Sequence, residues 1–189
     1  MREEEIVTLV KSGMQTLKEK DDWLLTNDLS ERSIAHRLAH YLEHLFIGYD
    51  VDCEYNGAIH DGGYQRKKVH MVKRELLHIE TELRERERHL EVDETIERSA
   101  HPDIIIHKRG HNDDNLCIIE IKKTTNIVGA SYDEIKLRSY TRHELDNALC
   151  YQLGLFIEIA MSSDKRDCLM RYFKNGEEFI RERNDNDLK

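Results

Sequence analysis

The sequence predicts an α/β fold in which a mixed β-sheet is flanked by helices. Two apolar runs, 104–106 and 116–119, are separated by a polar segment that contains Gly110, which is typical of two buried strands joined by a loop. Apolar residues recur with helical spacing before and after this hairpin, and a further buried strand is predicted at 155–160. At 189 residues, the chain is expected to form a single domain, 1–189.

Two helices are predicted in the first fifty residues. The first covers 3–20, and its apolar stripe is formed by Ile6, Val10, Met14 and Leu17. The second begins with a capping-box variant at Asp28 and Glu31, runs to about Phe46 and ends before Gly48. A helical projection places Glu31 near the centre of the apolar face. Two roles for Glu31 remain open, namely N-terminal capping of the helix and lining of a functional site.

A half-buried strand and a charged insertion are predicted next. Residues 49–55 alternate apolar and acidic side chains, as a half-buried strand does. From 66 to about 98 most residues are charged, and the apolar ones follow heptad spacing: Val69, Val72, Leu76, Ile79, Leu83 and Leu90. This pattern predicts a helical insertion over 65–99. It is either one amphipathic helix folded onto its own domain or a coiled-coil arm that forms a homodimer.

Three helices and one strand are predicted after the hairpin. A helix begins at Ser131 or Asp133 and extends through Leu137. A capping box at 141–144 starts a second helix that reaches Gly154. The buried strand at 155–160 follows, and residues 168–173 are apolar enough for a last helix packed on the sheet.

The composition limits the classes of partner. With 38 Asp and Glu residues against 29 Lys and Arg, the chain has no overall attraction to nucleic acid, so DNA contacts require a local basic surface. The four cysteines form no C-x-x-C pair and are expected to be reduced, which favours a cytoplasmic location. No signal peptide is recognised, and no apolar run approaches the roughly 18 residues that span a membrane. We therefore expect no membrane association.

Two carboxylates and an amine on the hairpin form a candidate metal site. If the loop spans 109–114, the register of the hairpin places Asp103 directly opposite Glu120. Lys122 shares their face because strand side chains alternate with period two. Facing carboxylates repel each other and are stabilised by a cation between them, and hard cations such as Mg²⁺ take oxygen ligands. The sequence therefore predicts a divalent metal site here.

The order helix, strand, insertion, strand, strand, helix, strand resembles the PD-(D/E)XK nuclease superfamily, with its restriction endonuclease-like αβββαβ core. The resemblance covers roughly 28–160 and rests on Pro102-Asp103 followed by Glu120-Ile121-Lys122. The insertion at 57–100 is longer than that core needs. The resemblance implies that Asp103, Glu120 and the Ile121 carbonyl bind Mg²⁺ or Mn²⁺, and that Lys122 positions or activates a water molecule.

The resemblance also implies two further site residues. Glu31 matches the Glu that a preceding helix brings to the site in this superfamily, where it orients a water molecule or binds a second metal. A polar residue on the following helix often completes the site, and Gln152 or Lys136 fits that place, with Gln152 preferred.

The implied function is a metal-dependent endodeoxyribonuclease that hydrolyses phosphodiester bonds in DNA. Two other classes remain open: a non-cleaving nucleic-acid-binding module on the same fold, and an interaction protein that acts through the heptad arm. The basic residues that are candidates for contact with DNA are Lys108, Arg109, Lys123, Lys136, Arg138 and Arg142, with a second cluster at Arg66, Lys67 and Lys68.

Overall fold

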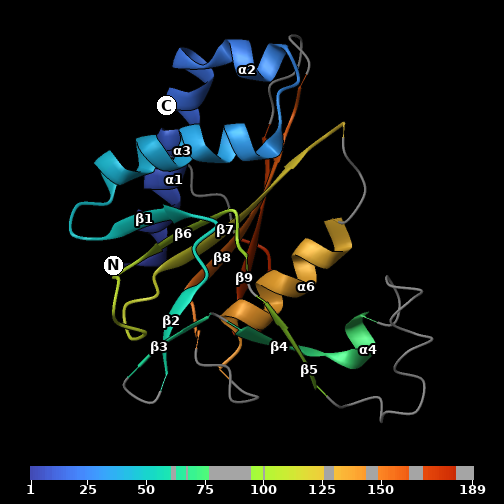
Figure 1. The fold of residues 1–189 in the computed structure, drawn as a ribbon. Helices are drawn as coiled ribbons and strands as arrows, with labels where there is room; N and C mark the ends of the chain where they lie inside the picture. The colour runs from blue at the N-terminus through green and yellow to red at the C-terminus, as the bar shows by residue number, and fades with distance from the viewer. Residues whose placement is uncertain are drawn as a thin grey trace.

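The computed structural model describes residues 1–60, 63–66, 68–76, 95–99, 101–125, 130–143, 149–161 and 168–181. Within them, the centre of the fold is a six-stranded mixed sheet with helices on both faces (Figure 1). The helices are α1 (Glu3–Lys20), α2 (Asp22–Thr26), α3 (Glu31–Leu45), α4 (Lys73–Leu76) and α6 (Ala130–Thr141). The strands of this sheet are β1 (Asp50–Cys53), β6 (Ile104–His107), β7 (Cys117–Lys123), β8 (Leu153–Ile159), β9 (Cys168–Lys174) and β10 (Glu177–Phe179). The predicted α/β class is confirmed.

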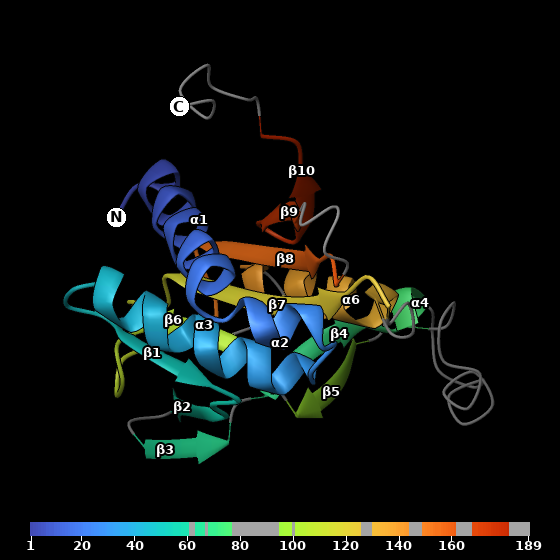
Figure 2. The ribbon, with the colours of Figure 1, turned by 90° about the horizontal axis from the view of Figure 1, so that it is seen from above.

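The sheet combines antiparallel and parallel pairing in the order β1-β6-β7-β8-β9-β10. Strand β6 is antiparallel to both of its neighbours, β1 and β7, whereas β8 is parallel to β7. A parallel pair needs a crossover connection, and α6 lies within the segment that joins β7 to β8. Strands β9 and β10 then extend the sheet by antiparallel pairing. Figures 1 and 2 show α1 and α3 on one face of the sheet and α6 on the other.

Side chains of β7 alternate between two apolar cores, as the period of a strand requires. Ile119 and Ile121 pack with α1 and α3, whereas Ile118 packs with Ile105 and the apolar residues of α6. Ile104 lies opposite Ile119 across the hairpin, so the predicted register is confirmed. The even-numbered residues of β7 therefore face α6.

Helix α1 packs closely on α3 at Gly13. A Cβ atom at this position would lie 2.6 Å from Leu42 Cδ2 and 3.4 Å from Leu38 Cδ1. Leu38 and Leu42 are fully buried on α3, so they have little room to move away. The absence of a side chain at Gly13 thus sets the position of α3 over the sheet.

We expect Gly13→Val to lower the free energy of unfolding by about 1–3 kcal/mol, because the added methyl groups overpack the contact with α3. Ser12→Val is the matched control, since it introduces the same side chain on the exposed face of α1. Urea denaturation measures both variants. Equal losses of stability would mean that the β-branched residue weakens the helix itself and that close packing is not the cause.

The described parts of the insertion are mostly strands. Strands β2 (Gly57–His60) and β3 (Gly63–Arg66) form one antiparallel pair, and β4 (Lys68–Val72) and β5 (Thr95–Ser99) form another. The prediction of one helix over 65–99 is therefore wrong at both ends, while residues 77–94 lie outside the described residues. Heptad spacing is a local pattern, and it cannot reveal that Val72 pairs with Thr95 much later in the chain. Homodimer formation through this segment stays a prediction.

Two predicted elements near the C-terminus are also wrong. Residues 168–173 form most of β9 and pair with β8, where a last helix was expected. The helix expected to run from 141 to Gly154 cannot do so, because Thr141 ends α6 and Gly154 lies within β8. Short apolar runs fit a helix or a strand equally well, and pairing with β8 decides between them.

Candidate functional site

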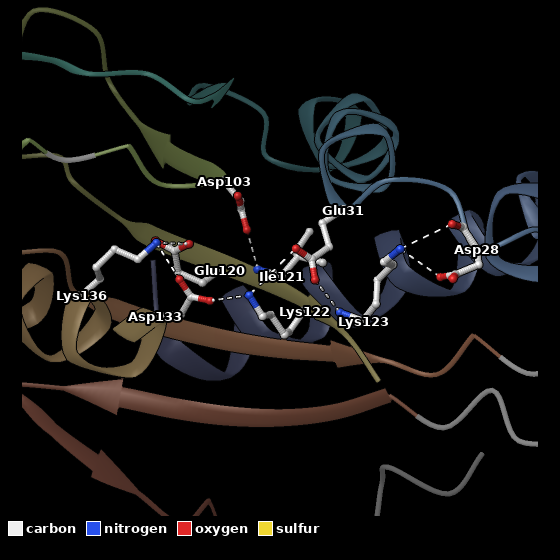
Figure 3. Close-up of polar contacts among 9 residues, drawn as sticks. All are labelled: Asp28, Glu31, Asp103, Glu120, Ile121, Lys122, Lys123, Asp133 and Lys136. Atoms are coloured by element: carbon white, nitrogen blue, oxygen red, sulfur yellow. Dashed lines mark hydrogen bonds and ion pairs between the residues drawn. The ribbon is translucent and has the colours of Figure 1, made fainter. Parts of the chain in front are cut away.

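The candidate site lies where β7 continues beyond the end of β6. Strand β7 pairs with β8 along its full length, whereas its pairing with β6 extends only to Ile119. The N–H groups of Ile121 and Lys123 therefore face an edge that β6 does not cover. Carboxylates take the place of a strand there: Asp103 Oδ2 accepts a hydrogen bond from Ile121 N at 2.8 Å, and Glu31 Oε1 accepts one from Lys123 N at 3.0 Å (Figure 3).

Asp103 and Glu120 face each other across the β6–β7 hairpin. The register that pairs Ile104 with Ile119, continued by one residue, places Asp103 opposite Glu120. Residues in this relation have Cβ atoms about 4.5–5.5 Å apart. Because Ile118 faces α6, Glu120 and Asp103 lie on the same α6-covered face of the sheet.

Helix α6 contributes two charged side chains to this face (Figure 3). Lys136 Nζ lies 2.9 Å from Glu120 Oε2 and 2.7 Å from Asp133 Oδ1. Lys122 Nζ lies 3.2 Å from Asp133 Oδ2 and 4.0 Å from Glu31 Oε2. Asp133 thus bridges two ammonium groups. Sequence reasoning missed Asp133 as a site residue, although its i, i+3 spacing from Lys136 on a predicted helix was a usable signal.

Burial makes ionisation of the facing carboxylates unfavourable. The Glu120 side chain is 1% exposed, and this burial raises its pKa well above the usual range. The positive charge of Lys136 lowers the pKa of Glu120 but does not offset burial, and the negative charge of Asp103 raises it further. Burial also raises the pKa of Asp103, although the hydrogen bond from Ile121 opposes this. For Lys136, burial lowers the pKa, but Glu120 and Asp133 outweigh it and raise the pKa. The site therefore favours additional positive charge.

Two buried polar atoms at this site have no hydrogen-bond partner among the described residues. They are Glu120 Oε1 and the hydroxyl of Tyr140, a residue with no exposed surface. Burial and then the charge of Glu120 raise the pKa of Tyr140, so the two groups interact electrostatically. A buried polar atom without a partner costs about 1–3 kcal/mol. Glu120 Oε1 is therefore a ready ligand for a cation.

Glu31 lies at the site as predicted, but the helix begins differently. Ser30 is the N-cap of α3, and its hydroxyl accepts a hydrogen bond from Ser33 N at 3.2 Å. Asp28, the predicted N-cap, has a positive φ of 52° and lies outside the helix, where it contacts Lys123 Nζ at 2.9 Å. Glu31 is the first residue of α3, and this position lets its carboxylate reach the end of β7.

Gln152 does not lie at the site, so its predicted catalytic role is not supported. It immediately precedes β8, whose first residue lies beside the first residue of β7, whereas Glu120 is three residues further along. At about 3.3 Å per residue, that separation is on the order of 10 Å. Gln152 Nε2 donates a hydrogen bond to Met1 O at 3.1 Å. Lys136, the alternative residue, is the one that contacts Glu120.

The basic residues predicted to contact DNA do not all gather at this site. Lys136 and Lys123 lie there, whereas the hairpin-loop residues do not (Figure 3). Lys108 and Arg109 lie at the loop end of the hairpin, away from Asp103, and contact Asp114 and Asp52 respectively. The other described candidates also contact acidic residues: Lys123 with Asp28, Arg138 with Glu178, and Arg142 with Glu75. Lys67 lies outside the described residues, and the side chains of Arg66 and Lys68 are not described.

Neither the described residues nor a comparison with known proteins assigns a function. Within the described residues, no group of three or more His, Cys, Asp or Glu side chains is placed so that it could hold a metal ion. No helix in the same residues is both long and apolar enough to cross a membrane. No protein-family model, curated protein or solved structure matches the chain. The function is therefore inferred from the geometry of the site.

Proposed function

We propose that the protein is a metal-dependent nuclease that hydrolyses phosphodiester bonds in DNA. The observation that carries this proposal is the facing pair Asp103 and Glu120, with a buried Glu120 oxygen that has no partner among the described residues. Carboxylate oxygens are the ligands that Mg²⁺ and Mn²⁺ prefer. Lys122 follows on the same face of β7 and supplies a positive charge for a phosphate group.

We further propose that the fold is the restriction endonuclease-like fold of the PD-(D/E)XK superfamily. The order α3, β1, β6, β7, α6, β8 supports this, because three antiparallel strands are followed by a helix and a parallel strand. Glu31 begins the helix that precedes the sheet, and Asp103 immediately precedes β6. Lys136 on α6 takes the place of the polar residue that this superfamily often carries on the following helix.

The donor set fits a hard divalent cation. Asp103 and Glu120 supply carboxylate oxygens, and the Ile121 carbonyl is the third donor. In a strand the N–H and C=O groups of one residue point to the same side. Because the Ile121 N–H donates to Asp103, its carbonyl also faces the edge that β6 leaves uncovered. A metal bound by these donors would polarise the phosphodiester and lower the pKa of a bound water molecule.

Lys122 is the side chain that we assign to charge stabilisation during hydrolysis. Its side chain is 12% exposed, and its ammonium group is held by Asp133 and Glu31, so it is oriented before substrate binds. Preorganised positive charge stabilises the negative charge that develops on phosphate oxygens in the transition state. Glu31 has a second role, because its hydrogen bond from Lys123 N holds the end of β7 in place.

A non-cleaving nucleic-acid-binding module is the second candidate function. Lys136 Nζ lies 2.9 Å from Glu120 Oε2. The described residues contain no group of three or more His, Cys, Asp or Glu side chains that could hold a metal ion. An ammonium group that permanently occupied the site would leave the fold intact without hydrolytic chemistry. DNA binding by the wild-type protein without cleavage, in either Mg²⁺ or Mn²⁺, would support this alternative.

We expect the wild-type protein to nick and linearise supercoiled plasmid in Mg²⁺ or Mn²⁺, and excess EDTA to stop the reaction. Asp103→Asn and Lys122→Met should each slow cleavage by at least about 100-fold, because each removes a charge that acts on the transition state. The rates are measured by gel electrophoresis, with an RNA substrate in parallel to test the choice of nucleic acid.

Asp113→Asn is the matched control for these variants. It neutralises an exposed carboxylate in the loop of the same hairpin, at the end remote from Asp103, and should cut at the wild-type rate. Wild-type rates for both Asp103→Asn and Lys122→Met would refute the assignment of the site.

A further inference from the structure

We propose that the Lys136 ammonium group occupies the cation position of the candidate metal centre in the metal-free protein, and that a divalent cation displaces it from Glu120. This inference rests on the metal site of the proposed function. Lys136 would thus set the affinity for metal, whereas Asp103 and Lys122 act in hydrolysis.

The two carboxylate oxygens of Glu120 differ in their contacts. Oε2 lies 2.9 Å from Lys136 Nζ, a distance at which an ammonium group neutralises a carboxylate directly. Oε1 is buried and has no hydrogen-bond partner among the described residues. One oxygen of Glu120 therefore pairs with Lys136, and the other can bind a divalent cation.

The net charge of the residues around Glu120 favours binding of a divalent cation. The described members of this cluster are four carboxylates and two ammonium groups: Glu31, Asp103, Glu120, Asp133, Lys122 and Lys136. Negative charges thus exceed positive ones by two when every group is ionised. A divalent cation balances this excess, whereas Lys136 by itself does not.

Lys136 can leave Glu120 without losing its charge partner. Its ammonium group also lies 2.7 Å from Asp133 Oδ1, which is one turn away on α6. Lys122 contacts Asp133 and Glu31, so a cation at Asp103 and Glu120 leaves its partners in place. Metal binding should therefore release Lys136 selectively. The exchange also means that Lys136 lowers the affinity for metal and raises the metal concentration needed to fill the site.

The first test compares Mn²⁺ affinity by isothermal titration calorimetry. Lys136→Met removes the competing ammonium group and keeps an unbranched side chain close to the length of the lysine stem. We therefore expect Mn²⁺ to bind at least about tenfold more tightly than to the wild type. Lys108→Met is the matched control. It removes another paired ammonium group, 3.2 Å from Asp114 at the far end of the hairpin, and should leave the affinity unchanged. Equal or weaker binding by Lys136→Met would overturn the proposal.

The second test uses the wild-type protein and does not depend on the folding of a variant. Brief acetylation with an amine-reactive ester, followed by peptide mass spectrometry, reports the exposure of each lysine with and without saturating Mn²⁺. We expect Mn²⁺ to increase labelling of Lys136 several-fold relative to Lys108, with no increase at Lys122. Unchanged or reduced labelling of Lys136, under conditions in which Mn²⁺ binds, would overturn the displacement.

The outcomes separate this inference from the proposed function. Absence of Mn²⁺ binding to both the wild type and Lys136→Met would overturn the displacement and the metal-dependent nuclease together. Mn²⁺ binding without release of Lys136 would overturn the displacement alone. Release of Lys136 by Mn²⁺ in a protein that does not cut DNA would support the displacement and refute the nuclease.

Discussion

Glu120→Gln should reduce metal-dependent DNA cleavage by about a thousandfold or more. Glutamine keeps the shape of the side chain but removes the charge that would hold a divalent cation opposite Asp103. Loss of a charged ligand withdraws several kcal/mol of transition-state stabilisation, and each 1.36 kcal/mol corresponds to about a tenfold change in rate. Plasmid cleavage in Mn²⁺ measures the loss, with Asp113→Asn as the control. Cleavage by Glu120→Gln at the wild-type rate would exclude Glu120 as a catalytic or metal-binding residue.

The same substitution should increase the stability of the metal-free protein. The pKa of Glu120 is raised well above 4.5 on folding, chiefly by burial, so the folded state disfavours the charged form. At a pH above the unfolded-state pKa, folding must therefore either bury the charge or take up a proton, and glutamine needs neither. The gain should be present at pH 7 and should disappear below about pH 4, where Glu120 is protonated in both states.

Urea denaturation in EDTA at pH 7 and pH 4 measures this difference. A variant that is inactive and yet more stable than the wild type would show that Glu120 is retained for function at the expense of stability. A lower stability of Glu120→Gln at pH 7 would show instead that the ion pair with Lys136 outweighs the burial of the charge.

Asp52→Asn should lower the free energy of unfolding by about 2 kcal/mol at pH 7. Asp52 on β1 connects to the loop end of the hairpin: its Oδ2 lies 3.0 Å from His107 Nε2 and accepts a hydrogen bond from Arg109 Nε at 2.8 Å. The Asp52 side chain is 16% exposed and that of His107 is 3% exposed, so solvent screens this contact weakly. The Arg109 side chain is 56% exposed, so its contact with Asp52 is screened more strongly. Tyr55 packs on His107 with ring centroids 4.9 Å apart.

The effect of Asp52→Asn should depend on pH in a defined window. Burial by itself raises the pKa of Asp52, but hydrogen bonds from His107 and Arg109 outweigh it and lower the pKa to about 2. Because the folded pKa is lower than the unfolded value of 3.8, the stabilisation is present above pH 3.8 and is lost as the pH falls through 2. The difference between wild type and Asp52→Asn should therefore shrink at acidic pH.

Urea denaturation at pH 7 and near pH 3 tests this window. Asp113→Asn serves again as the control, because it changes an exposed carboxylate in the same region and should alter stability by less than about 0.5 kcal/mol. If Asp52→Asn lowers the free energy of unfolding equally at both pH values, the charge of the Asp52 carboxylate does not stabilise the network.

Local patterns predicted the elements that surround the site. Helical spacing predicted 3–20, and the structure places α1 over the same residues. The apolar runs 104–106 and 116–119 predicted β6 and β7 with the observed register. Elements that depend on distant partners were predicted wrongly: β4 and β5 pair across the insertion, and β9 pairs with β8. Spacing along a short segment does not show which segment will lie beside it.

The sequence by itself determined that Asp103 and Glu120 face each other with Lys122 on the same face. The physical reason is that strand side chains alternate with period two, and the positions of the two apolar runs set the register. Only the tertiary structure decided which charges complete the site. Helix α6 packs its apolar residues on Ile105 and Ile118, and this packing brings Asp133 and Lys136 to the carboxylates and leaves Gln152 at the far end of β7.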